Sequence, residues 1–196
     1  MRIRARRPGA PALVHISVRP SAVGPLTLAV AGRTLVYCGF APPVAVRRRM
    51  ARAAPEWCGQ ILHSAVTTEA LEEVGAQLEA YLGGRSREFS LLLDLRLAPL
   101  FTREAVTALG GLVPYGRTAT YGELAAAMGR PTAARAVGTA LAANPLCVIL
   151  PCHRIVGSTG RLTGYAGGLR AKQYLLDLEG RPLARGVRAA PDARWR

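Results

Sequence analysis

The residues best suited to chemistry in this chain are Cys152 and His153, which stand side by side after a short apolar run and Pro151. The thiolate is the reactive form of cysteine, and a neighbouring imidazole favours it. The apolar run, residues 148–150, predicts a buried strand that the proline ends. The pair therefore indicates a nucleophilic cysteine in a rigid, partly enclosed position. The alternative is a structural thiol beside a core imidazole, because free cysteine is often simply buried.

The composition is that of a globular protein with a large excess of positive charge. Its 196 residues suffice for one large domain or two small ones. The formal net charge of +14, from 26 basic and 12 acidic residues, is typical of a protein that meets a polyanion. A bias toward Ala, Arg, Gly and Pro explains the charge equally well. No apolar run approaches the ~20 residues that span a bilayer, and no secretory signal follows the basic N-terminus, so we expect a cytoplasmic protein.

The cysteines and histidines do not show the spacing of a metal site. A zinc site takes about four ligands, commonly in paired CxxC or HxxxH spacing. Disulfides are rare in the cytosol, so we expect free thiols and no metal. The residues concerned are Cys38, Cys58, Cys147, Cys152, His15, His63 and His153.

The first half of the chain predicts a small α+β domain over residues 13–98, after a disordered basic arm at 1–12. Apolar residues that recur every three or four positions indicate a helix, with Thr68 as its N-terminal cap. The expected elements are strands at 13–18, 26–30 and 35–40, the last two forming a hairpin, a helix at 69–82 and a strand at 89–94. Nothing in this half looks catalytic, and the run Arg47-Arg48-Arg49 is expected to be a solvated face.

The second half, residues 99–180, predicts short helices that include a helix-turn-helix. Thr120 and Glu123 have the spacing of a capping box, which satisfies free N–H groups at the start of a helix. Glycine-rich turns at 157–160 and 164–168 predict a loop whose backbone approaches a ligand. The expected helices run from a Thr102 cap to Leu109, from 121 to 128, from a Thr132 cap to about 142, and from 169 to 178, before a basic tail at 181–196.

The second helix of the predicted helix-turn-helix has unusually small side chains, and Arg135 is its only charge. Small side chains let a helix backbone come close to another surface, which suits either DNA or the rest of the domain. One arginine reads few base edges, so we do not expect recognition of a particular DNA sequence.

Several motifs of the second half occur together in a fixed order. They are Pro114-Tyr115-Gly116, Thr120-Tyr121-Gly122-Glu123-Leu124-Ala125, Arg135-Ala136-Val137-Gly138, Asn144-Pro145, Pro151-Cys152-His153-Arg154-Ile155, Gly164-Tyr165 and Lys172 through Leu176 to Glu179. From about residue 101 to 180 the chain resembles the alkylguanine-DNA alkyltransferase family, also called methylated-DNA–protein-cysteine methyltransferases. The resemblance implies an α+β fold, with a small ribonuclease-H-like N-terminal domain, matched more loosely at residues 24–29, and a winged helix-turn-helix-like C-terminal domain.

The resemblance implies a DNA-repair protein that transfers an alkyl group from O6 of guanine, and from O4 of thymine, to its own Cys152. The family flips the damaged nucleotide out of double-stranded DNA, because the target atom is not accessible in the base stack. Each molecule would act once, since the thioether is stable, and no cofactor would be needed. The implied partner is double-stranded DNA with O6-alkylguanine in any sequence, bound by a monomer.

The resemblance also assigns roles to single residues. His153 would be a base that acts on Cys152 through a water, and Glu179 would orient its imidazole. Asn144 would tie down the turn beneath the reactive residue, and Tyr121 would contact the phosphate and the guanine. The implied DNA-binding residues are Arg135, which would fill the gap in the base stack, with Tyr121, Thr132, Ala133, Ala134 and Gly138. The implied pocket residues are Tyr165, Ala166, Ile155, Cys147 and Pro151.

Two other functions compete with this one. The first is a non-catalytic winged-helix protein that binds DNA lesions or regulates expression, with Cys152 as a structural residue. The second is a cysteine hydrolase that uses Cys152 and His153, although adjacent residues of a strand point to opposite faces and pair poorly.

Cys147 also departs from the family pattern, because many relatives carry proline or another small residue there.

Overall fold

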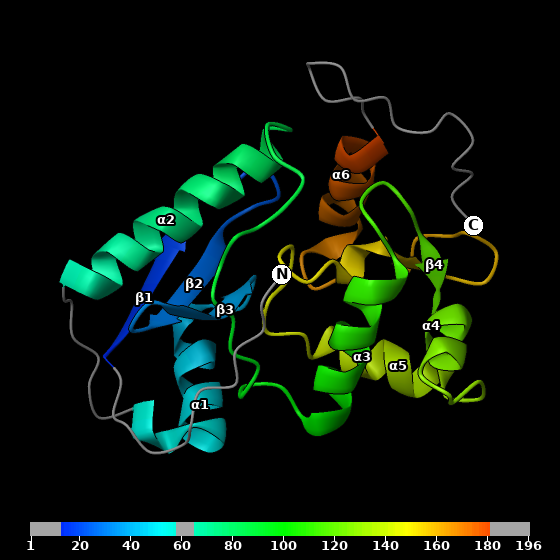
Figure 1. The fold of residues 1–196 in the computed structure, drawn as a ribbon, viewed down its shortest axis with the longest axis horizontal. Coiled ribbons are helices and arrows are strands. Elements are labelled where there is room, and N and C mark those ends of the chain that lie inside the picture. Colours follow the sequence, from blue (N-terminus) through cyan, green and yellow to red (C-terminus); the bar gives the residue numbers. More distant parts are fainter. Residues whose placement is uncertain (1–12, 58–64, 181–196) are drawn as a thin grey trace. The chain divides into compact units, whose positions relative to one another are not determined.

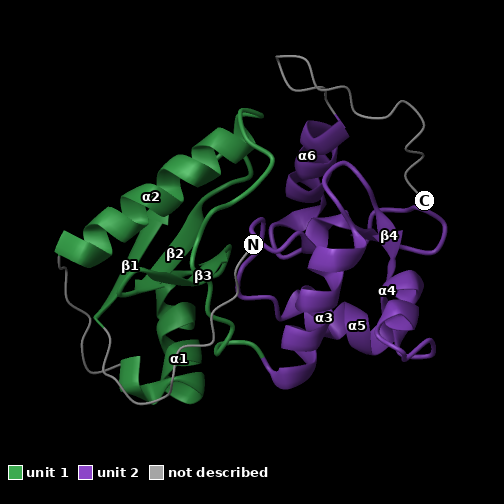
Figure 2. Ribbon diagram, viewed as in Figure 1, with its two compact units in different colours: residues 1–98 green, residues 99–196 purple. Residues whose placement is uncertain are grey.

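The computed structural model describes residues 13–57 and 65–180. The chain divides into two compact units, Met1–Ala98 and Pro99–Arg196 (Figure 2). Each unit combines helices with strands, so the α+β class is confirmed. The predicted basic arm and basic tail lie outside the described residues. No helix in the described part of the chain has the length and apolar character to cross a membrane.

The first unit is built on an antiparallel sheet in the order β1-β2-β3. Gly32, at a φ of +58°, forms the turn of the predicted hairpin. Helix α2 packs against β1 and β2, and lies along the sheet in Figure 1. The bounds are β1 Val14–Arg19, β2 Leu26–Ala31, β3 Thr34–Gly39, α1 Pro43–Ala53, the 3-10 helix η1 Pro55–Trp57 and α2 Ala65–Leu82.

Two helices of this unit differ from the expectation. Helix α1 was not predicted, because its run of arginines hides the apolar pair Val46 and Met50, one turn apart and both buried. Helix α2 begins at Ala65, so Thr68 lies inside its first turn and does not cap it. Thr67, the residue before Thr68, is fully buried and lies within the helix.

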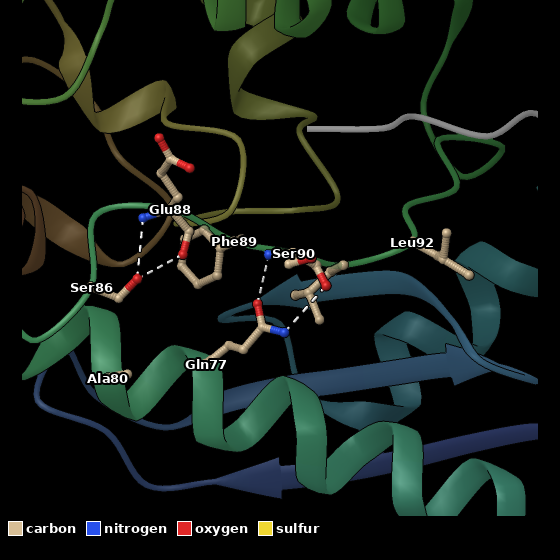
Figure 3. A pocket seen from close by; sticks show the side chains of 8 residues that line it. Gln77, Ala80, Ser86, Glu88, Phe89, Ser90 and Leu92 are labelled. Atoms are coloured by element: carbon tan, nitrogen blue, oxygen red, sulfur yellow. Dashed lines mark hydrogen bonds between the residues drawn. The ribbon is translucent and has the colours of Figure 1, made fainter.

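The predicted strand at 89–94 is reduced to one parallel bridge between Leu93 and Leu35. Burial does alternate at Leu91 and Leu93 as the pattern indicated. The Gln77 side chain, however, replaces a neighbouring strand: its Oε1 accepts from Ser90 N at 2.8 Å and its Nε2 donates to Ser90 O at 3.2 Å (Figure 3). Leu92 O and Asp94 N still pair with Leu35, but at Ser90 a side chain of α2 satisfies the backbone groups that a longer ladder would use, so most of the predicted strand is absent. This segment also lines a cavity of about 540 Å³ with α2.

The described residues of the second unit, 99–180, form four α-helices, one 3-10 helix and a two-stranded parallel sheet. Helices α3, α4 and α5 pack on one another, and β4 pairs with β5. The capping box is confirmed: Glu123 N donates to Thr120 Oγ1 at 3.1 Å and Thr120 N donates to Glu123 Oε2 at 2.6 Å. The bounds are α3 Leu100–Leu112, β4 Ala119–Thr120, α4 Tyr121–Ala127, α5 Ala134–Ala142, the 3-10 helix η2 Cys152–Arg154, β5 Ile155–Val156 and α6 Gly168–Gly180.

The other two threonine caps of this unit were wrong. Thr102 is buried inside the first turn of α3, which begins after Pro99 without a side-chain cap. Helix α5 begins after Ala133, also without a side-chain cap, and leaves Thr132 exposed. Helix α3 starts two residues before the threonine that the pattern favoured, and α5 starts two residues after it.

The predicted strand before the reactive cysteine is a tight turn. Leu150 N donates to Leu146 O and Cys152 N to Leu150 O, both at 2.8 Å, and Val148 adopts a φ of +71°. A β-branched residue with positive φ is rare and costs conformational energy, which the surrounding packing must supply. The strand prediction failed because apolar residues in a buried turn have the same pattern as a short buried strand.

Candidate active site

Cys152 opens the 3-10 helix η2 and has only 7% of its surface exposed. Asn144, at the end of the turn after α5, donates its side-chain Nδ2 to Cys152 Sγ at 3.3 Å. The same amide donates to Leu150 O at 3.1 Å, and its Oδ1 accepts from Leu146 N at 3.0 Å. One buried side chain thus closes the turn at residues 144–152 and fixes the position of the sulfur.

The surroundings of Cys152 favour its thiolate. A hydrogen bond with Cys147 lowers the pKa of the Cys152 thiol. Burial acts in the opposite direction, but Asn144 and the positive charge of Lys172 add to the lowering, so the pKa lies below its ordinary value. A lowered pKa increases the fraction of Cys152 that is thiolate, the form in which a cysteine acts as a nucleophile.

Lys172, the single lysine of the chain, lies buried on α6. Its Nζ donates to Ile155 O at 2.5 Å and to Thr163 O at 2.8 Å. Burial lowers the pKa of Lys172 to about 8, although the Cys152 thiolate acts against this change. The sequence analysis named Lys172 only as part of a motif. The available signal was that Lys172 is the single lysine, whereas every other Lys or Arg position of the chain is arginine.

His153 and Glu179 form the centre of a buried polar network. His153 Nε2 lies 2.6 Å from Glu179 Oε1, and both side chains are fully buried. Arg154 donates its Nε to Glu179 Oε2 at 2.8 Å, its Nη2 to Oε1 at 3.2 Å and its Nη1 to Val113 O at 2.8 Å. Gly116 N donates to Glu179 Oε2 at 3.1 Å. The sequence analysis named Arg154 only as part of a motif and gave it no role; the available signal was a basic residue within an apolar segment.

Protonation in this network follows from its contacts. Burial by itself raises the pKa of Glu179, but the hydrogen bond and charge of His153 and the guanidinium of Arg154 lower it to about 2. Burial lowers the pKa of His153, and its contact with Glu179 offsets this only in part. Neutral His153 therefore donates from Nε2 to an ionised Glu179. Its Nδ1 is buried and has no hydrogen-bond partner among the described residues, which leaves a basic nitrogen open to a proton.

Cys152 lines a cavity of about 450 Å³. Tyr121 is fixed there by its hydroxyl, which accepts from Thr163 Oγ1 at 3.1 Å. Tyr165 lies edge-on to the ring of His153, with 6.3 Å between the ring centroids. The cavity is lined by Tyr121, Gly138, Leu141, Ala142, Cys152, Gly164, Tyr165 and Ala166.

Five of the fifteen predicted site residues line this cavity. Tyr165 and Ala166 line it, as does Gly138, which the sequence analysis assigned to DNA. Leu141, Ala142 and Gly164 also line it and were not predicted. Three predicted pocket residues, Ile155, Cys147 and Pro151, are buried and do not belong to its lining.

The predicted DNA-binding residues lie at the start of α5 and just before it. Thr132 and Arg135 are exposed, whereas Ala133 and Ala134 are half-buried. No hydrogen bond or ion pair engages the Arg135 side chain within residues 13–57 and 65–180. The same helix reaches the cavity one turn later at Gly138, so α5 runs from the exposed Arg135 to the cavity. The described residues contain no group of three or more His, Cys, Asp or Glu that could hold a metal ion.

Comparisons with known proteins agree in one family. Residues 101–181 match the family model described as 6-O-methylguanine DNA methyltransferase, DNA binding domain. The chain is 37% identical over 169 residues to the methylated-DNA–protein-cysteine methyltransferase of Methanosarcina acetivorans, covering 85% of this chain and 99% of the relative. It is 39% identical over 167 residues to that of Mycobacterium tuberculosis strain H37Rv, covering 85% and 93%.

Two solved structures from Mycobacterium tuberculosis are also similar, each at 36% identity. The O6-methylguanine methyltransferase has a TM-score of 0.68, with 88% of this chain and 97% of that chain covered. The structure of OGT in complex with DNA has a TM-score of 0.67, with 84% and 92% covered.

Proposed function

The chain belongs to the methylated-DNA–protein-cysteine methyltransferase family, and from this premise we propose that Cys152 is the acceptor of the alkyl group. The protein repairs alkylated DNA by transferring an alkyl group to a cysteine of its own. The observation that carries the assignment is the position of Cys152 in the cavity wall: the other described cysteines, Cys38 and Cys147, are buried and do not line it.

The reaction is a single displacement at the alkyl carbon of O6-alkylguanine. The Cys152 thiolate attacks this carbon, the new S–C bond forms as the C–O6 bond breaks, and the electron pair stays on guanine O6. The product is a thioether, a poor leaving group, so each molecule acts once. The same displacement applies to O4-alkylthymine, which presents an equivalent alkyl–oxygen bond.

His153 acts as the base that removes the thiol proton, through a bridging water. Its Nδ1 is the atom available for this, because Nε2 is engaged by Glu179 at 2.6 Å. Glu179, held ionised by Arg154, fixes the tautomer and stabilises the imidazolium that forms. Lys172 supports the thiolate by its charge. Asn144 aims the sulfur.

The nucleotide reaches Cys152 by leaving the duplex. DNA binding through phosphate contacts is independent of sequence, as a positive charge of +14 favours. Arg135 fills the gap in the base stack, while Thr132, Ala133 and Ala134 let the start of α5 come close to the backbone. Tyr121 contacts the phosphate of the flipped nucleotide and lends its hydroxyl to the guanine.

The cavity holds the flipped base. Tyr165 and Ala166 close over it, and the main-chain oxygens of Cys152 and Ile155 accept from its amino group. Ile155 O already accepts from Lys172 at 2.5 Å, but a carbonyl oxygen has two lone pairs and takes a second donor. A pocket of about 450 Å³ is in the range that binds small organic groups.

We also propose a finer description of the fold. The first unit, with its antiparallel sheet and long helix, is ribonuclease-H-like, and the second is a winged helix-turn-helix whose second helix is α5. The protein acts as a monomer in the cytoplasm on double-stranded DNA that carries O6-alkylguanine.

The test is intact-protein mass spectrometry after incubation with duplex DNA that contains one O6-methylguanine. We expect a gain of one methyl group per chain, mapped to the peptide with Cys152 and saturating at that value. The Cys152→Ala variant should gain nothing, whereas Cys38→Ala, which removes a buried thiol of the first unit, should react like the wild type.

Three outcomes would overturn the assignment of Cys152 as the acceptor. Tight binding of the lesion without a mass gain would identify a non-catalytic lesion-binding protein, the first competing function. Release of more than one methyl group per chain, with Cys152 unmodified, would identify a hydrolase. A methyl group found on another cysteine would leave the family reaction in place and move the acceptor.

A further inference from the structure

A second thiol, that of Cys147, lies against the reactive one and has no part in the reaction described above. Cys147 sits in the turn that Asn144 closes, and only 3% of its surface is exposed. Its sulfur hydrogen-bonds with Cys152, and it also lies 3.6 Å from Asn144 O. Because Cys147 does not line the cavity, its contact with the site is through the Cys152 sulfur and not through the base.

Asn144 gives the two sulfurs opposite environments. Its side-chain Nδ2 donates to Cys152 Sγ at 3.3 Å, whereas its main-chain oxygen accepts from Cys147 Sγ at 3.6 Å. A donor beside a sulfur favours the thiolate, and an acceptor beside a sulfur favours the thiol. The negative charge therefore belongs on Cys152 and the proton on Cys147.

We propose that Cys147 is a positioning residue for the transfer: its S–H donates a hydrogen bond to the Cys152 thiolate and thereby holds that sulfur ionised. The thiol has one hydrogen, which turns from Asn144 O to Cys152 Sγ when Cys152 loses its proton. The proposal rests on the proposed function, because it gives the acceptor of that reaction its charge. The direction of the Cys152 pKa, lowered first of all by this hydrogen bond, supports it.

A packing role for Cys147 makes a different prediction, and substitutions separate the two. Cysteine packs as a small hydrophobe, so a packing site accepts alanine more readily than serine, whose hydroxyl is costly to bury. A donor site accepts serine, which keeps a hydrogen on a side chain of similar size, and rejects alanine. If Cys147 is a hydrogen-bond donor, Cys147→Ser should resemble the wild type more closely than Cys147→Ala does. If Cys147 only fills space, Cys147→Ala should be the closer of the two.

The readout is the rate at which iodoacetamide alkylates Cys152 between about pH 6 and pH 10, followed by peptide mass spectrometry so that Cys147 and Cys152 are counted separately. The elements around Cys152 carry the following titratable or charged groups: Arg170, Lys172, Tyr174, Asp177 and Glu179 on α6, His153 and Arg154 on η2, Tyr121 and Glu123 on α4, Arg135 on α5, and Tyr165 in the cavity wall. All of them are the same in every variant, so a difference in the midpoint pH reports position 147.

We expect Cys147→Ala to raise the midpoint by about one pH unit, which slows alkylation about tenfold on the acid side, the size of one hydrogen bond to a charged group. Cys147→Ser should return the rate to within about threefold of the wild type. Cys38→Ala, which removes a buried thiol of the first unit, should leave the profile unchanged.

The same proteins are then given the O6-methylguanine duplex, so that failure of this inference and failure of the proposed function are distinct. If the wild type accepts a methyl group and Cys147→Ala keeps the wild-type midpoint, the inference is overturned and the function stands. If Cys147→Ala shifts the midpoint while no protein accepts a methyl group, the function fails and the hydrogen bond stands. Should Cys147→Ala fail to fold, Cys147→Ser decides: a wild-type profile supports the donor, and a shifted one overturns it.

Discussion

Arg154 donates two hydrogen bonds to the carboxylate of Glu179, at 2.8 and 3.2 Å, and the pair is buried. The geometry is that of a guanidinium fork on a carboxylate, the strongest pairing available to these groups. The same carboxylate also lies 2.6 Å from His153 Nε2. The one negative charge of Glu179 therefore both balances the buried guanidinium and orients the imidazole that we propose as the base.

Glu179→Gln should be strongly destabilising. The substitution keeps the shape but leaves the Arg154 guanidinium buried without its counter-charge, which costs about 3–5 kcal/mol in comparable sites. Urea unfolding measures the loss. The matched control is Glu104→Gln, which breaks an exposed ion pair with Arg130 and should cost about 0–1 kcal/mol. A loss below about 1 kcal/mol for Glu179→Gln would show that the fork contributes little.

The Cys38 thiol should make stability depend on alkaline pH. Burial raises the pKa of Cys38 from 9.0 to about 12. A pKa raised in the folded state gives a contribution that is complete below the unfolded pKa and is lost as pH rises toward the folded one. The window is therefore about pH 9 to about pH 12, and the loss is about 1.4 kcal/mol per pH unit.

This loss is measured as the difference in unfolding free energy between the wild type and Cys38→Ala. The difference should be constant below about pH 9 and should shrink above it. Lys172 also titrates in this range, with a pKa of about 8, but it does so in both proteins and cancels. A difference that stays constant up to pH 11 would contradict the raised pKa of Cys38.

Thr120→Ala should destabilise the second unit by about 1 kcal/mol, because it removes the acceptor for Glu123 N at the start of α4. Thr132→Ala is the control, since Thr132 precedes α5 without capping it, and should change stability by less than about 0.5 kcal/mol. Equal losses in urea unfolding would mean that the capping box does not stabilise α4 specifically.

Arg135→Ala should weaken repair of duplex DNA far more than reaction with free O6-methylguanine base. Only the duplex requires a base to leave the stack, and without the arginine the gap that the base leaves stays unfilled. We therefore expect the rate on duplex DNA to fall about tenfold, or about 1.4 kcal/mol. Single-turnover rates on both substrates give the ratio. Arg52→Ala removes the same charge from an exposed position on α1 and serves as the control. An equal loss on both substrates by Arg135→Ala would rule out the flipping role.

Local signals in the sequence predicted the elements that local interactions form. The capping box at Thr120 and Glu123 is such a case, because its two hydrogen bonds lie within four residues. The apolar face of α2 is another: Leu71, Val74 and Leu78 are all buried.

Caps and strands that depend on distant partners were not predictable in this way. Thr102 and Thr132 have the chemistry of caps, but packing decides where α3 and α5 begin. The segment at 89–94 alternates like a strand, yet Gln77 of α2 takes the backbone hydrogen bonds of Ser90. The apolar pattern of a segment shows which of its residues are suited to burial, but it does not show which distant group will hydrogen-bond to its backbone.

The site shows the same limit. His153 and Glu179 are 26 residues apart, and only the resemblance to a known family suggested that they meet. The contacts of Arg154 and Lys172 were beyond reach, because a basic residue in the sequence is expected at the surface. Both are buried here, one on a carboxylate and one on two carbonyl oxygens.

The pairing of β4 with β5 sets a limit on chain length. Strand β4 ends at Thr120, directly before Tyr121, and β5 begins at Ile155, directly after η2, with Thr120 opposite Val156. An inserted or deleted residue at either junction would displace Tyr121 relative to Cys152 by about 3.3 Å, roughly the thickness of a base. We therefore expect insertions to be tolerated in turns such as those at Gly129 and Gly160, but not at these two junctions, where they would shift a residue that lines the cavity.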